Sequence, residues 1–102
     1  MIDLEPGDTD TLARAHLNRS LALVQLGRLE EALADATAVI DLEPGNVEGL
    51  ARGHFVRAFV LVELGRTDEA VADLQMILRL LPPTHELSRL ATGVLADLGI
   101  SE

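Results

Sequence analysis

A ten-residue stretch that occurs twice constrains the fold of this chain more than any other feature. Residues 23–32 read Leu-Val-Gln-Leu-Gly-Arg-Leu-Glu-Glu-Ala, and residues 61–70, 38 positions later, read Leu-Val-Glu-Leu-Gly-Arg-Thr-Asp-Glu-Ala. Gly27 and Gly65 stand where a helix needs a left-handed terminator, a conformation that glycine adopts without a Cβ penalty. The alanine that ends each copy is small enough for the next helix to pack closely on its partner. Each copy is therefore predicted to be the corner between two antiparallel helices.

The repetition extends beyond these corners and divides the chain. Residues 2–16 are identical to residues 40–54 at ten of 15 positions, so the first residues are interpreted as the end of a preceding repeat that is truncated. The predicted organisation is a single domain with that tail at 1–7, a first repeat at 8–45, a second repeat at 46–83 and a terminal helix at 84–102.

The spacing of apolar residues predicts helices throughout. Apolar residues recur every three to four positions, and no stretch alternates with the period of two that a strand requires. Pro44 and Pro82 interrupt the pattern at the ends of the two repeats, because proline cannot continue a helical hydrogen-bond ladder. The predicted fold is all-α, with about two and a half repeats of antiparallel hairpins and five helices at about 8–26, 29–42, 47–64, 67–81 and 85–98.

Composition excludes several classes of function. The chain has no cysteine and no lysine, and its eight arginines stand against 17 acids, which gives a net charge of −9. Nucleic acid is not an expected partner, because phosphate neutralisation needs a basic face. No uncharged stretch approaches the roughly 18 residues of a membrane span. Without a targeting signal, the expected compartment is the cytoplasm.

The positions of small residues, glycine and proline in each unit resemble the tetratricopeptide repeat. Small residues stand at Ser20 and Ala58, Leu-Gly precedes each turn, alanine follows it, and proline ends the unit. The resemblance implies hairpins stacked into a right-handed superhelix whose inner face is lined by the first helix of each hairpin. Two features depart from the family. Histidines (His16 and His54) stand where its first large aromatic residue is usual, and the period is 38 residues instead of 34.

No catalytic constellation is found. His16 and His54 are the same position in successive repeats, and a residue that recurs with the repeat is expected to serve packing, since a catalytic residue is normally unique. The glycines lack the spacing of a phosphate-binding loop. The chain is therefore predicted not to be an enzyme, and no cofactor or metal ion is expected.

Arg19 and Arg57 also recur at the repeat period. The resemblance places them at hairpin-packing positions, which implies that each faces the second helix of its own hairpin. There, Asp35 and Asp73 are the expected partners, with Glu31 and Glu69 as nearby alternatives, so a repeated Arg–Asp pair across each hairpin is predicted. A role of the two arginines as ligands for an anion is the alternative. Partly buried ion pairs contribute little net stability but are costly to break singly.

A second line of residues on the first helices falls, by the resemblance, on the inner face. Both phenylalanines of the chain lie on it. An apolar face bordered by arginines would suit an amphipathic helix or an apolar peptide that carries acids. The alternative is that these residues pack against neighbouring helices. The predicted protein-binding residues are Arg14, Leu17, Leu21, Val24, Arg52, Phe55, Phe59, Val62 and Arg89.

The function expected from these features is a scaffold for protein–protein contact that binds a peptide or helix of a partner on its inner face. The alternative is an architectural segment of a larger repeat protein that associates with itself and has no separate ligand. Self-association, most simply as a homodimer, is expected in addition, because the first and the last helix each lack one neighbour. Leu12, Ala15 and Ala22 would then be partly uncovered.

Overall fold

The computed structural model describes residues 8–42 and 45–99. In this part of the chain five helices follow one another, and no strand is present. Their bounds are α1 Asp8–Gln25, α2 Leu29–Asp41, α3 Val47–Glu63, α4 Thr67–Leu80 and α5 Glu86–Asp97. The all-α prediction is confirmed, and the helix ends lie within one or two residues of those expected. The repeat tail expected at residues 1–7 lies outside the described residues.

Glycines with a positive φ follow α1, α3 and α5, at Gly27, Gly65 and Gly99, as the sequence predicts for the first two. Gly27 and Gly65 have φ values of +77° and +79°. At the first corner the amide of Arg28 donates to the carbonyl of Leu23, and the amide of Gly27 donates to that of Val24, at 2.9 and 3.0 Å. This pair of bonds satisfies carbonyls that a helix end would otherwise leave without donors. The second corner repeats both bonds, which explains why the ten-residue stretch recurs.

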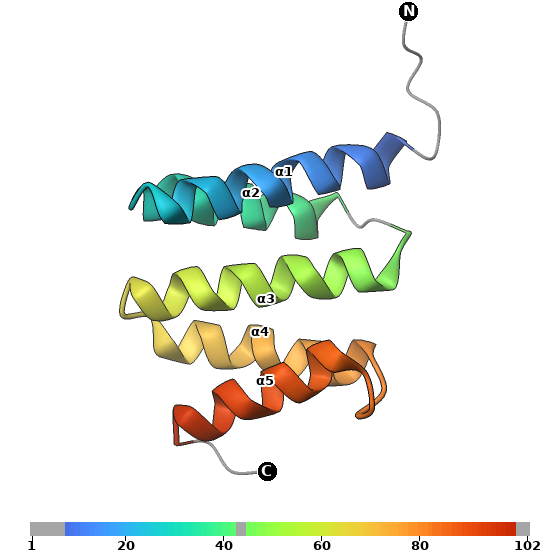
Figure 1. Cartoon of the computed structure of the whole chain (residues 1–102), viewed down its shortest axis with the longest axis vertical. Coiled ribbons are helices and arrows are strands. Elements are labelled where there is room, and N and C mark those ends of the chain that lie inside the picture. Colours follow the sequence, from blue (N-terminus) through green and yellow to red (C-terminus); the bar gives the residue numbers. More distant parts are fainter. Residues whose placement is uncertain (1–7, 43–44, 100–102) are drawn as a thin grey trace, which may run out of the picture.

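The helices form two layers (Figure 1). In this view α1, α3 and α5 lie in front, with α2 behind α1 and α4 behind α5. Within the described residues α1 contacts α3 and α3 contacts α5, whereas α2 and α4 do not approach each other closely. The front layer is therefore the more tightly packed one. One side of the front layer faces away from α2 and α4. It is the side that the sequence analysis expected to be the inner face, and this name is used for it below.

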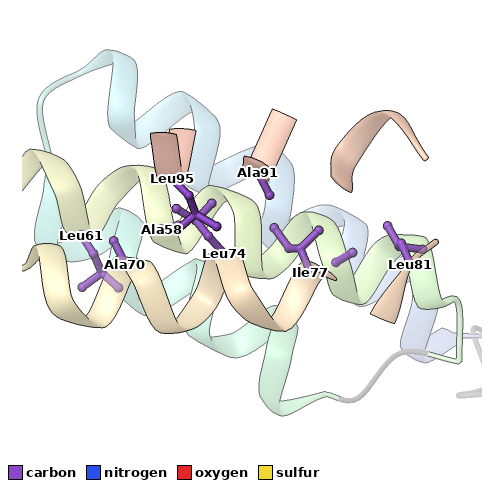
Figure 2. Packing of buried hydrophobic residues seen from close by; sticks show 9 residues of the cluster. Ala58, Leu61, Ala70, Leu74, Ile77, Leu81, Ala91 and Leu95 are labelled. Atoms are coloured by element: carbon purple, nitrogen blue, oxygen red, sulfur yellow. The ribbon is translucent and has the colours of Figure 1, made fainter. Parts of the chain in front are cut away.

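Two apolar clusters form the core, and α3 contributes to both. The first-repeat core consists of Ala13, Leu17, Leu23, Ala32, Ala36, Val39, Val56 and Val60. The second-repeat core, shown in Figure 2, consists of Ala51, Ala58, Leu61, Ala70, Leu74, Ile77, Leu81, Ala91 and Leu95. The alanines that end the two corner stretches are fully buried, as their small size predicts. Because α5 supplies Ala91 and Leu95, the terminal helix is part of the core.

α2 packs closely against α3 at Gly53. A Cβ atom placed on this glycine would lie 2.7 Å from Cγ1 and 3.2 Å from Cβ of Val39. The corresponding residue of the first repeat, 38 positions earlier, is Ala15, which is exposed. Glycine is thus found where a preceding second helix packs against the first helix, and alanine is found where the structure describes no such helix.

This difference predicts opposite effects for two glycine-to-alanine changes. Gly53→Ala should destabilise the protein by about 1 kcal/mol or more, because overpacking against Val39 outweighs the gain in helix propensity. Gly93→Ala, in α5, should stabilise it by up to about 1 kcal/mol, because an added Cβ meets no atom within 4 Å there. Urea unfolding of both variants measures the two effects, and a stabilising Gly53→Ala would contradict the packing described.

Candidate functional site

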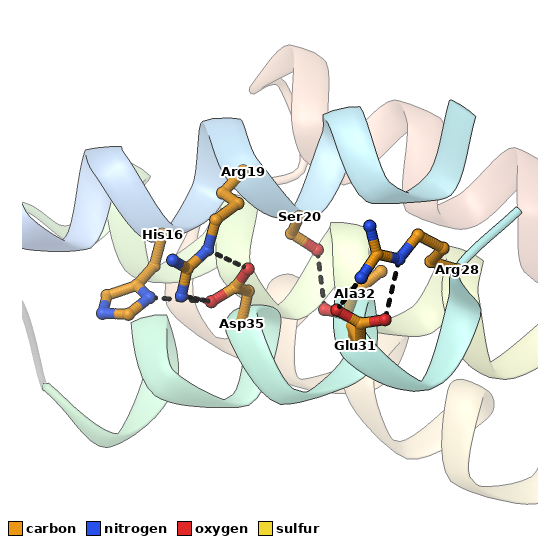
Figure 3. A network of polar contacts seen from close by, with 7 residues as sticks. All are labelled: His16, Arg19, Ser20, Arg28, Glu31, Ala32 and Asp35. Atoms are coloured by element: carbon orange, nitrogen blue, oxygen red, sulfur yellow. Dashed lines mark hydrogen bonds and ion pairs between the residues drawn. The ribbon is translucent and has the colours of Figure 1, made fainter. Parts of the chain in front are cut away.

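Polar side chains join α1 to α2 in the first hairpin (Figure 3). Arg19 donates from Nε to Oδ2 of Asp35 and from Nη2 to Oδ1, both at 2.7 Å. His16 Nδ1 lies 2.9 Å from Asp35 Oδ1. Nearby, the hydroxyl of Ser20 donates to the carbonyl of Ala32 at 2.8 Å. The predicted Arg–Asp pair is confirmed, and a histidine completes a three-residue cluster.

The second hairpin contains the same cluster in a more buried setting. Arg57 donates from Nε and Nη2 to the two carboxylate oxygens of Asp73 at 2.8 Å, and His54 Nδ1 lies 2.8 Å from Oδ1. The Arg57 side chain is 26% exposed, whereas that of Arg19 is 65% exposed. The difference arises because α2 covers Arg57, with the Thr37 hydroxyl 3.5 Å from Nη1.

Electrostatics in both clusters favours the ionised carboxylate. Hydrogen bonds from Arg19 lower the pKa of Asp35. Burial by itself would raise the pKa of Asp73, but hydrogen bonds from Arg57 and His54 outweigh it, and the pKa is lowered. Both aspartates therefore accept hydrogen bonds as anions at neutral pH.

These clusters act as clamps within each hairpin. Each guanidinium donates two parallel bonds to its own aspartate and so ties the first helix of the hairpin to the second. Among residues 8–42 and 45–99, no group of three or more histidine, aspartate or glutamate side chains is placed to hold a metal ion. The recurring histidines and arginines thus hold the two helices of each hairpin together.

The inner face carries two separate hollows. The first lies between the N-terminal parts of α1 and α3 and is called the arginine hollow; the second lies between α3 and α5 and is called the phenylalanine hollow. The arginine hollow is lined by Asp10, Ala13, Arg14, Leu17, Val39, Asn46, Glu48, Gly49 and Arg52. The phenylalanine hollow is lined by Phe55, Ala58, Phe59, Val62, Glu63, Leu74, Val94, Asp97 and Leu98.

The predicted binding residues are distributed unevenly over these hollows. Arg14, Leu17 and Arg52 line the first, and Phe55, Phe59 and Val62 line the second. Leu17 is buried in the first-repeat core, and Val24 packs against the same core. Leu21 is half exposed and lines neither hollow.

Arg89 likewise lies outside both hollows and donates from Nη2 to the carbonyl of Thr84 at 3.4 Å. The charged residues that line the phenylalanine hollow are thus Glu63 and Asp97, and not the arginines that were expected beside the apolar residues.

Six residues of the phenylalanine hollow were not among those predicted from the sequence: Ala58, Glu63, Leu74, Val94, Asp97 and Leu98. The repeat itself could have indicated that the two acids lie at equivalent places. Glu63 and Asp97 each stand two residues before a turn glycine, in equivalent positions of α3 and α5. The contribution of α5 was harder to anticipate, because its spacing from the preceding proline to the turn glycine is shorter than in the two full repeats.

His85 anchors the N-terminal end of α5. Its Nδ1 accepts a hydrogen bond from the amide of Leu87 at 3.0 Å, so the ring proton is on Nε2. That Nε2 lies 2.8 Å from Oε2 of Glu48 in α3, and the contact lowers the pKa of Glu48. Together with the buried Leu95, this contact fixes α5 against α3 and so positions both walls of the phenylalanine hollow.

Comparison with known families decides the classification. A family model of the tetratricopeptide repeat matches residues 13–46, and a second model of this repeat matches residues 51–72. Together the two matches cover more than half of the chain. The chain belongs to the tetratricopeptide repeat family. Comparison with curated proteins and with solved structures gives no significant match.

Membership in the tetratricopeptide repeat family agrees with the hairpin geometry. The first match contains the corner glycine Gly27 and the buried Ala32, and the second contains Gly65 and Ala70. Tetratricopeptide repeats generally mediate protein–protein interactions and have no catalytic role of their own. In the described part of the chain, no helix is long and apolar enough to cross a membrane.

Proposed function

We propose that this tetratricopeptide repeat protein is an interaction scaffold that binds a peptide or helix of a partner protein on its inner face. The observation that carries the proposal is the position of Phe59. It is one of two aromatic residues in the chain, yet it is 49% exposed and lies at an apolar hollow between α3 and α5. Aromatic residues at concave, apolar sites are the usual anchors of protein interfaces.

The size and lining of the hollow favour a side chain of a partner over a small molecule. Its volume is about 280 Å³, near the lower limit of roughly 300 Å³ for pockets that enclose drug-sized ligands. Its polar groups are two carboxylates, whereas small-molecule sites use several convergent polar groups to fix orientation. No reaction is proposed for this face.

Phe59→Ala tests this function. Because the ring is half exposed, the variant should lose about 2 kcal/mol or less of unfolding free energy, in contrast to the roughly 3–5 kcal/mol expected for a core phenylalanine. Proteins recovered on the immobilised wild-type chain from a cell extract should be absent with Phe59→Ala. The matched control is Val47→Ala, a similarly exposed position in α3 outside the hollow. Equal recovery with both variants would contradict the proposal.

Self-association is a second candidate, favoured by the exposed side of α1. Leu12 and Leu26 are 47% and 68% exposed, and Ala15 and Ala22 are exposed as well. In the second repeat the residues equivalent to these two alanines, Gly53 and Val60, are buried. We propose that this side of α1 binds a second copy of the chain.

Sedimentation equilibrium over a hundredfold range around micromolar concentration tests self-association. The wild-type mass should rise above 10.9 kDa, and Leu12→Ser combined with Leu26→Ser should restore the monomer mass. A constant mass of the wild-type chain would contradict this second candidate and leave binding on the inner face unaffected.

A further inference from the structure

The phenylalanine hollow combines an apolar floor with an acidic border. Its apolar lining comes from α3, α4 and α5, and its charged lining residues are Glu63 and Asp97. Resting on the function proposed above, we propose that the partner segment bound here carries a large apolar side chain flanked by lysine or arginine. The apolar side chain would enter between Phe55, Phe59 and Leu98, and the flanking cations would meet the two carboxylates.

The two carboxylates are available for such a contact. Both Glu63 and Asp97 are exposed, and neither takes part in an ion pair within the described residues. The last turns of α3 and α5, where they lie, contain no basic residue. Four other acids of the described chain are engaged by arginine: Glu31, Asp35, Glu69 and Asp73. The acids at the hollow therefore differ from these four in lacking a cation.

The helix ends strengthen the negative potential. Glu63 and Asp97 end two helices whose C-termini both lie at this side of the inner face. A helix C-terminus carries a partial negative charge, which adds to that of the two side chains. A cation beside the apolar anchor is therefore favoured, and an acid at the same place is disfavoured.

The arginine hollow shows that the whole inner face is not acidic. Arg14 and Arg52 line it together with Asp10 and Glu48, so its charges are mixed. Arg52 precedes Phe59 by seven residues, which places the two roughly 10 Å apart along α3. The requirement for a flanking cation is therefore specific to the hollow at the C-terminal ends of α3 and α5.

Two amphipathic peptides of about 16 residues, with one shared leucine and phenylalanine face, test this inference by fluorescence anisotropy. One peptide carries lysines beside that face and the other carries glutamates at the same positions. The lysine peptide should bind the wild-type chain roughly tenfold more tightly than the glutamate peptide, and added salt should reduce the difference. Phe59→Ala should weaken the lysine peptide by tenfold or more.

Matched charge variants separate a local effect from the net charge of the protein. Glu63→Gln with Asp97→Asn should weaken binding of the lysine peptide several-fold. Glu30→Gln with Asp68→Asn changes the net charge equally at exposed positions outside the hollow and should have little effect. Equal effects of the two double variants would overturn the inference.

The remaining outcomes are equally decisive. If the glutamate peptide binds as well as the lysine peptide and depends on Phe59, the charge requirement is wrong but binding on the inner face stands. If neither peptide binds, or if Phe59→Ala does not change the affinity for the peptide, both proposals fail. If Phe59→Ala converts a dimer of the chain into a monomer, the hollow is occupied by a second copy and the inference is overturned.

Discussion

Asp73→Ala should lower the free energy of unfolding by about 3–5 kcal/mol, the range expected when one partner of a buried ion pair is removed. Asp73 accepts three hydrogen bonds, two from Arg57 and one from His54. Without the carboxylate, a buried imidazole and a largely covered guanidinium lose their acceptor between α3 and α4. Urea unfolding at neutral pH measures the loss.

The repeat supplies a matched control for this change. Asp35→Ala removes the same carboxylate from the first hairpin, where Arg19 is 65% exposed and water can replace the lost acceptor. Its cost should be smaller by at least about 1 kcal/mol. Equal costs for the two variants would show that the cover provided by α2 does not matter, which would contradict the account of the clamps.

The same cluster predicts a response to acid. Because the folded-state pKa of Asp73 is lowered, its contribution to stability is fully present above the ordinary aspartate pKa of about 4 and is lost as the pH falls through the lowered value. The wild-type chain should therefore lose stability below about pH 4. Asp73→Ala should lose less over that interval, since the variant no longer has this carboxylate.

Leu95→Ala should be the most damaging change in α5, with a cost of about 2–5 kcal/mol for the lost leucine and the cavity left behind. Leu95 is 1% exposed and belongs to the second-repeat core. Its neighbour Val94 and the nearby Leu98 line the phenylalanine hollow. A loosened α5 would displace that wall, so we expect peptide binding to be lost even where most of the chain remains folded.

Leu90→Ala is the control for this prediction, because it shortens a leucine of α5 that is 46% exposed. It should cost about 1 kcal/mol or less and leave binding intact. Thermal unfolding followed by circular dichroism, together with the anisotropy titration, measures both properties. Binding that survives Leu95→Ala unchanged would show that α5 does not form part of the site.

The helices and their corners could be predicted because the repetition itself marks them. Gly27 and Gly65 occupy left-handed positions at equivalent corners. The Arg–Asp pairs followed from the repeat period together with the hairpin-packing positions of the family. The histidine contacts did not follow in this way. His54 recurs with the repeat, but only the packed hairpin shows that its ring reaches the carboxylate that Arg57 also binds.

Sequence spacing could predict which residues of the first helices lie on the inner face. It could not predict the shape of the surface that they form. Sequence spacing places Leu17 and Phe55 at equivalent positions, and each packs on a core cluster. Leu17, however, is buried and lines the arginine hollow, whereas Phe55 is only partly buried and lines the phenylalanine hollow. The difference depends on the neighbouring helices, since α5 builds the far wall of the hollow. Its shorter spacing breaks the 38-residue period, so Val94 and Asp97 could not be placed beside Phe59 by extending that period alone.

The central claim, that a partner segment binds in the phenylalanine hollow, is tested most directly by nuclear magnetic resonance. The ¹⁵N-labelled chain is titrated with the lysine peptide and, separately, with the glutamate peptide, and the amide shifts are mapped. We expect the largest saturable shifts at Phe55, Phe59, Val62, Val94 and Leu98. Largest shifts at Leu12 in α1 and at Leu26, which follows α1, or no saturable shifts with either peptide, would contradict this claim.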